Sequence, residues 1–222
     1  MISKLPRWVW PGAWVLAFVA GIVNVVGLLG FDHHPVTHLT GTTSLLGEAV
    51  SRLDGPAAGH LLLLIGAFLV GTVFSGALVG DRPLRLGRRY GVALLVESIC
   101  LCAAVPLLAR GHVAGMCLAA FAVGVQNALV STYSGAVVRT THVSGMFTDL
   151  GLFLGHALRG LPVDRRRGRL CFLVISGFLA GGVAGALLFR AAGPAALFVP
   201  GVLTALAAAG NFLPRVRRDG PG

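Results

Sequence analysis

The chain alternates between long apolar runs and short connections rich in arginine or glycine. Six apolar runs are long enough to be helical membrane spans, since about 20 residues cross the hydrocarbon core of a bilayer. The pattern predicts these spans at residues 10–30, 59–79, 90–109, 113–133, 170–189 and 194–213. We therefore expect an all-α membrane protein with six transmembrane helices in a single integral membrane domain over residues 1–222.

Two further apolar stretches, 38–53 and 142–158, are too short to cross a bilayer comfortably. If 38–53 did cross, the arginine cluster within 82–89 would move to the other side of the membrane, against the charge pattern described below. We expect both stretches to be re-entrant or interfacial helices, and the sequence leaves these two alternatives open.

One pattern of residues occurs twice in the chain. Three pairs of stretches match in the same order: 21–24 with 124–127, 38–41 with 142–145, and 65–71 with 175–181. The pattern predicts two repeats, about 9–110 and 112–213, each with three spans and one re-entrant or interfacial helix. Three crossings per repeat would invert the second copy, the arrangement by which many transporters form a site near the midplane.

Glycines occur in and just after the third pair of matching stretches. Their spacing favours close packing between helices. In the first copy these are Gly66, Gly71 and Gly76, and in the second they are Gly177, Gly181 and Gly185. We expect both series to lie at helix–helix contacts.

Composition and charge support a membrane protein. Residues are 55% hydrophobic and 12% charged, and the mean hydropathy is +0.83, whereas soluble domains have about 25% charged residues. The net charge of +10 also fits a nucleic-acid binder. With the N-terminus inside, however, all of the 18 basic residues except Arg52, Arg110 and Arg190 face the cytoplasm. We therefore expect no nucleic-acid partner, and a multi-pass protein of the bacterial inner membrane with both termini cytoplasmic.

The first apolar run is preceded by basic residues, so a cleaved signal peptide is an alternative for 10–30. The run is about 20 residues long and contains the repeated Asn24. We expect it to be a retained span.

Asn24 and Asn127 lie inside predicted spans at matching positions of the two repeats. Each amide needs a partner within the protein, because hydrocarbon offers none. Two interpretations stand side by side: a hydrogen bond that holds helices together, or a pair of ligand-facing amides near the midplane.

His38 and His142 open the two short stretches, followed by the hydroxyl residues Thr40 and Thr43 in the first and Ser144 in the second. Such hydroxyls can cap a helix, and the N–H groups and dipole at a helix N-terminus favour an anion or a carboxylate. These five residues are candidates for the transport pathway. The alternative is that they only cap two interfacial helices.

Two acidic residues are further candidates. Glu97 is the only acidic residue deep in a predicted span, where a charge costs about 2.5–3.5 kcal/mol; it serves either a proton-coupled step or a neutral hydrogen bond. Asp149 follows His142 and is expected to form an ion pair with Arg139 or Arg159. A weaker alternative makes Asp149 an acid or base, together with a histidine, in an intramembrane enzyme.

The sequence contains no convincing metal or catalytic motif. The cluster from Asp32 to His38 has three histidines, but His33 and His34 have no counterpart in the second repeat. The four cysteines show no zinc-like or disulfide spacing, and no nucleophile motif occurs. We expect no metal, no cofactor and no enzymatic activity.

With these motifs the chain resembles the YoaK-like family of bacterial inner-membrane proteins, a domain of unknown function. The resemblance rests on the stretches 21–24, 38–41 with Gly47, 124–127, 135–145 and 148–151, and so covers nearly the whole chain. The family often has Asn where Thr42 stands here, and Thr where Ser144 and Met146 stand. The resemblance implies six spans and supplies no substrate.

These observations favour a small transporter or channel for a solute or ion, with a polar site at the midplane between inverted repeats. The alternative is a non-transporting membrane protein that binds a partner or assists assembly. The small size of the chain also makes a homodimer plausible.

Overall fold

The structure, a computed structural model, describes residues 9–30, 37–80, 87–134 and 140–212. Within these ranges it is entirely helical. The elements are α1 (Val9–Gly30), α2 (Leu39–Ser51), α3 (Gly55–Val79), α4 (Arg88–Ala109), α5 (Val113–Ser134), α6 (Val143–Leu158), α7 (Arg165–Ala192), the short 3-10 helix η2 (Gly193–Leu197) and α8 (Phe198–Phe212).

The predicted spans fall on helices. The first five correspond to α1, α3, α4, α5 and α7, and the sixth to η2 with α8. Among the described residues, five helical stretches are long and apolar enough to cross a membrane, of which the last, Arg165–Phe212, has 48 residues and contains α7, η2 and α8. The two shorter predicted stretches are the helices α2 and α6. This pattern is that of a multi-pass membrane protein.

Local signals explain several helix ends. Asp54 accepts a hydrogen bond from the backbone N–H of Ala57 at the start of α3, and Asp164 does the same for Arg166 and Arg167 at the start of α7. The helices α3 and α7 end where the backbone takes a positive φ, 64° at Gly80 and 57° at Gly193. Glycine adopts this conformation without steric cost, so it terminates both helices.

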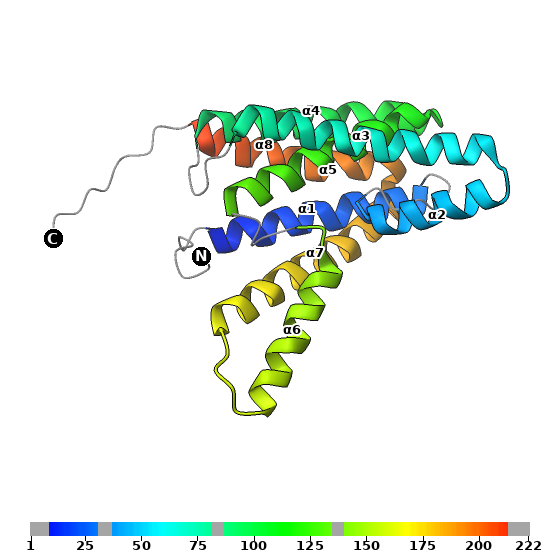
Figure 1. Cartoon of the computed structure of the whole chain (residues 1–222). Helices are drawn as coiled ribbons and strands as arrows, with labels where there is room; N and C mark the ends of the chain where they lie inside the picture. Colours follow the sequence, from blue (N-terminus) through cyan, green and yellow to red (C-terminus); the bar gives the residue numbers. More distant parts are fainter. Residues whose placement is uncertain (1–8, 31–36, 81–86, 135–139, 213–222) are drawn as a thin grey trace.

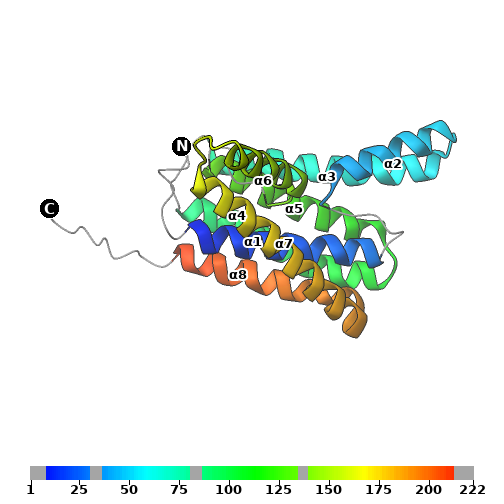
Figure 2. The same cartoon turned by 90° about the horizontal axis from the view of Figure 1, so that it is seen from below.

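The helices form a bundle from which two elements project. Helices α1, α3, α4, α5 and α8 run roughly along one direction, while α6 and the first part of α7 stand away from the bundle (Figure 1). The start of α1 and the end of α8 lie at the same end of the bundle in both views (Figures 1 and 2). The main contacts pair α1 with α7, α3 with α5, and α4 with both α5 and α8.

The α1–α7 crossing brings the two backbones into direct contact. A Cβ atom on Gly21 would collide with the carbonyl oxygen of Phe178, and one on Gly181 would collide with the carbonyl oxygen of Phe18. Only glycine permits such an approach. Gly177 also packs against α1, as we expected from its spacing.

The α3–α5 crossing repeats these contacts with the equivalent residues. A Cβ atom on Gly124 would meet the carbonyl oxygen of Phe68, and one on Gly71 would meet that of Phe121. The repeated glycines of the sequence are therefore the points where helices of the two repeats touch.

The expected glycine contacts of α3 were wrong at two positions. A Cβ atom on Gly66 or Gly76 would meet nothing within 4 Å, so of the three glycines only Gly71 lies at a helix crossing. The physical reason is geometric: two helices that cross at an angle touch over a short segment.

Candidate functional site: a cavity where two short helices begin

Helices α2 and α6 begin at the same cavity, whose lining includes the exposed residues His38, Thr40, His142 and Ser144. The cavity has a volume of about 240 Å³. Apart from Asn24, its lining consists of five pairs of residues at matching positions of the two repeats: Thr37 and Thr141, His38 and His142, Leu39 and Val143, Thr40 and Ser144, and Phe68 and Phe178. In Figure 2, α2 and α6 diverge from this region in opposite directions, and in Figure 1 α6 runs downward away from the bundle. Both helix N-termini thus face one shared space.

The two histidines lie over the first turns of these helices. Nδ1 of His38 accepts a hydrogen bond from the backbone N–H of Gly41 at 3.2 Å, and a Cβ atom on Gly41 would come within 2.6 Å of that nitrogen. The ring of His142 lies against Gly145 with its Cδ2–Nε2 edge and forms no capping hydrogen bond. The glycine in each His-x-x-Gly box therefore makes room for an imidazole ring.

Each repeated asparagine binds the threonine that precedes a histidine box. Thr37 Oγ1 donates to Asn24 Oδ1 at 2.6 Å. In the second repeat, Thr141 Oγ1 lies 2.7 Å from Nδ2 and 2.9 Å from Oδ1 of Asn127. These bonds fasten the starts of α2 and α6 to α1 and α5. Asn24 also lines the cavity, whereas Asn127 is not among the lining residues, so the ligand-facing interpretation stays open for Asn24 only.

Gln126 forms two hydrogen bonds that have no counterpart at the matching position of the first repeat, which is Val23. Its side chain is fully buried, and Nε2 donates to the carbonyl oxygen of Leu16 at 2.9 Å and to Thr140 Oγ1 at 3.0 Å. The amide therefore ties α5 to α1 and to the segment that precedes α6.

Glu97 lies apart from the cavity. Its side chain on α4 is 1% exposed, and neither carboxyl oxygen has a hydrogen-bond partner among the described residues. Its neighbour Ser98 donates to the carbonyl oxygen of Gly201 at 2.7 Å and so joins α4 to α8. The proton-coupled role of Glu97 stays a prediction, and the geometry gives it no contact with the cavity lining.

A family model described as "Protein of unknown function (DUF1275)" matches residues 12–210 of the chain. The chain belongs to the DUF1275 family. This confirms the resemblance to the YoaK-like membrane proteins. The chain is also similar to the UPF0700 transmembrane protein RA0705 of Rhizobium meliloti (strain 1021), with 30% identity over 202 residues that cover 90% of this chain and 85% of the relative. No solved structure matches the chain.

Membership in DUF1275, together with the long apolar helices, makes this a polytopic membrane protein. Neither comparison indicates an enzymatic activity or names a substrate.

Replacement of Glu97 in this DUF1275 protein is expected to raise its stability. A buried polar group without a partner costs about 1–3 kcal/mol, and methionine fills a similar volume without that cost. We expect Glu97→Met to raise the thermal unfolding midpoint in detergent, and Glu97→Gln to change it less. A drop in the midpoint of Glu97→Met would mean that the carboxyl is bound by a partner, such as an internal water.

The remaining predicted site residues lie outside the cavity lining. Thr43 is exposed, and its hydroxyl donates to the carbonyl oxygen of Leu39 at 2.8 Å. Asp149 forms an ion pair with Arg167 at 2.9 Å, so the expected pairing with Arg159 was wrong. The other expected partner, Arg139, lies outside the described residues. Arg167 takes the carboxylate because α6 and α7 pack on each other.

Asp149 and His156 line a separate cavity of about 270 Å³ between α6 and α7. No group of three metal-binding side chains occurs in the part of the chain that the structure describes. His33 and His34 lie outside that part.

Sequence reasoning missed the pair Leu39 and Val143, which lies within the histidine boxes, and two further pairs of residues at the cavity. Thr37 and Thr141 hold the asparagines, and Phe68 and Phe178 close the lining. Both pairs carried a signal: each threonine precedes a box histidine, and each phenylalanine lies in the third pair of matching stretches. These residues therefore lie in or beside the matching stretches, but the sequence alone does not show which residues they contact.

Proposed function

We propose that this protein transports a small solute or ion and consists of two inverted repeats that share a site near the middle of the membrane. One observation carries the proposal: the helices α2 and α6 begin at one cavity that is lined by matching residues of both repeats. Transporters often use the N-termini of interrupted helices in this way.

The course of the chain supports the inversion. In Figure 1, α1 and α7 run in one direction and α3 and α5 in the other, and the chain turns back at η2 before α8. Helices α1 to α4 would then be the first repeat and α5 to α8 the second, with six crossings in total. The matching contacts of α1 with α7 and of α5 with α3 agree with this assignment.

The short helices have the dimensions of half-membrane elements. The 13 residues of α2 extend about 20 Å, and the hydrocarbon core is about 30 Å thick. A helix that starts at the cavity and runs to one surface fits this length. We therefore propose that α2 and α6 are re-entrant elements rather than helices that lie on the surface.

The described arginines support an orientation with both termini in the cytoplasm of a bacterium. The starts of α4 and α7 and the end of α6 lie at the same end as the start of α1 (Figure 2). These helix ends carry Arg88, Arg89, Arg159, Arg165, Arg166, Arg167 and Arg169. The ends of α2, α4 and α7 lie at the other end and carry Arg52, Arg110 and Arg190. Cytoplasmic loops carry the excess of basic residues.

The cavity favours a small polar solute. A volume of about 240 Å³ corresponds to roughly eight water molecules in the liquid. Apart from the N–H of Gly41, which donates to His38, the first-turn N–H groups of α2 and α6 have no partner within their helices, and the two helix dipoles place partial positive charge at the cavity. A solute with a carboxylate or another acceptor group would match these donors.

The second candidate is a non-transporting protein that binds a partner or assists assembly. The hydrogen bonds of Asn24 with Thr37 and of Asn127 with Thr141 favour it, since they give the Asn24 oxygen a donor and both ends of the Asn127 amide a partner within the protein. In that case the cavity would be closed to water. A homodimer is compatible with either function.

Cysteine labelling distinguishes these functions without knowledge of the solute. Thr40→Cys and Ser144→Cys are placed singly in a background in which the four native cysteines are alanine. Because both positions line one cavity, we expect a membrane-impermeant thiol reagent to label both with the same sidedness in intact cells and inside-out vesicles.

The matched control is Leu69→Cys on the exposed surface of α3, where 59% of the side chain is accessible in the isolated chain. Lipid should cover this position and prevent labelling. If neither Thr40→Cys nor Ser144→Cys reacts from either face, the cavity is sealed and the transport proposal is wrong.

A further inference from the structure

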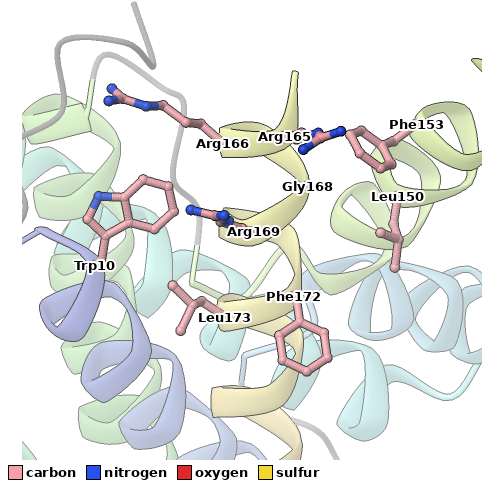
Figure 3. Close-up of a pocket in the computed structure, with 9 residues that line it drawn as sticks. All are labelled: Trp10, Leu150, Phe153, Arg165, Arg166, Gly168, Arg169, Phe172 and Leu173. Carbon is pink, nitrogen blue, oxygen red and sulfur yellow. The ribbon is translucent and has the colours of Figure 1, made fainter. Parts of the chain in front are cut away.

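A second, larger cavity lies between the start of α1, α6 and the first turns of α7. Its volume is about 900 Å³, and it is separate in its lining from the cavity described above. Arg165, Arg166 and Arg169 of α7 line it together with Trp10 of α1 (Figure 3). The proposed transport function makes no use of this cavity.

The lining changes from basic to apolar along α7. Arg165 and Arg169 are one turn apart at the start of the helix, and Phe172 and Leu173 follow on the next turn. In Figure 3, Arg169 and Leu173 extend toward Trp10, whereas Arg165 and Phe172 lie on the side of α6. A molecule bound here would meet cations at the end of the bundle and apolar groups further in.

Among the described residues that line the cavity, none is acidic, so none of them pairs with Arg165 or Arg169. Asp149 of α6 and Asp164, which precedes α7, have other partners: Asp149 pairs with Arg167, and Asp164 accepts hydrogen bonds from the backbone N–H groups of Arg166 and Arg167. Among the described residues, no ion pair involves Arg165 or Arg169. The cavity therefore presents positive charge to an anionic ligand.

The position of the cavity matches the boundary between headgroups and hydrocarbon. It lies where the apolar part of α7 begins, and the arginines precede that part. Tryptophan is enriched at this depth of a membrane. Phe172 is 65% exposed in the isolated chain, so the apolar side of the cavity is open toward the position of lipid chains.

We infer that this cavity binds an anionic phospholipid, with its phosphate on Arg169 beside Trp10, Arg165 as a second cation at the start of α7, and its acyl chains against the apolar part of the lining at Leu173 and Phe172. Basic pockets between membrane helices bind lipid headgroups by this combination of charge and apolar contact. The order of groups along α7, basic and then apolar, fits a lipid better than a free phosphate, because a free phosphate has no apolar part to contact Phe172 and Leu173.

Trp10 provides a direct probe of the bound lipid. With Trp8→Phe and Trp14→Phe, Trp10 is the sole tryptophan of the chain. The purified protein is placed in phosphatidylcholine vesicles that contain either brominated phosphatidylglycerol or brominated phosphatidylcholine, whose bromine atoms quench a nearby indole. We expect about fivefold preferential association of phosphatidylglycerol per arginine that contacts it, and loss of this preference in Arg165→Gln/Arg169→Gln.

The control variant is Arg88→Gln/Arg89→Gln, which removes two arginines at the same end of the bundle that do not line the cavity. It should keep the preference for phosphatidylglycerol. Equal quenching by the two lipids, or the same loss in both double variants, would overturn the inference, because only a general surface attraction would remain. Relief of quenching by millimolar inorganic phosphate would identify a free anion as the ligand instead and would equally overturn it.

Discussion

Leucine in place of Gly181 is expected to prevent stable folding, whereas leucine in place of Gly66 is expected to leave the protein folded. At Gly181 even a Cβ atom would collide with the backbone carbonyl of Phe18, and α1 and α7 would have to separate. At Gly66 no atom lies within 4 Å of that position. Overpacking costs about 1–3 kcal/mol where side chains can adjust, and the cost is higher where a backbone must move.

Both substitutions replace glycine by leucine in the middle of an apolar helix, so changes in helix propensity and hydropathy are matched. The measurement is the fraction of protein that elutes as a single species in detergent after heating, for the wild type and each variant. The repeat predicts a second matched result: Gly71→Leu, equivalent to Gly181→Leu, should be as damaging. If Gly66→Leu were equally damaging, the assignment of Gly181 and Gly71 to helix crossings would be wrong.

Features that depend on neighbours in the sequence could be predicted well. The length of each apolar run and the placement of arginine located the helices, since both properties are local. The start of α7 is five residues earlier than the predicted span because Asp164 caps a first turn that consists mainly of arginine. The sixth predicted span begins with η2 because Gly193 and Pro194 interrupt the helical chain before α8.

Features that depend on contacts between distant segments could not be predicted in the same way. The repeat indicated that Asn24 and Asn127 are equivalent, and the structure adds that each binds the threonine before a box. The equal spacing of Gly66, Gly71 and Gly76 gave no sign that only the middle one lies at a crossing. The position of Glu97 away from the cavity likewise follows from the packing of α4, which contacts mainly α5 and α8.

The proposed function depends on the observation that the N-terminal ends of α2 and α6 lie at one cavity. A covalent cross-link between these two helix ends tests this observation directly. In a cysteine-free background that carries Thr40→Cys and Ser144→Cys, a protease site is inserted between Gly111 and His112, where the exposed connection joins α4 to α5. Cleavage then separates the two cysteines into different fragments. Because Thr40 and Ser144 line one cavity of about 240 Å³, we expect a short bismaleimide to join nearly all fragments in native membranes.

The control is the matched pair of Thr40→Cys with Leu154→Cys. Leu154 is exposed and lies about 15 Å further along α6 than Ser144. This pair should stay unlinked under the same conditions. Efficient linking of the first pair alone would locate both helix starts at one point, which is what an inverted pair of half-membrane helices requires. If neither pair were linked although each cysteine reacts singly, α2 and α6 would begin at separate places, and the shared site on which the transport proposal rests would not exist.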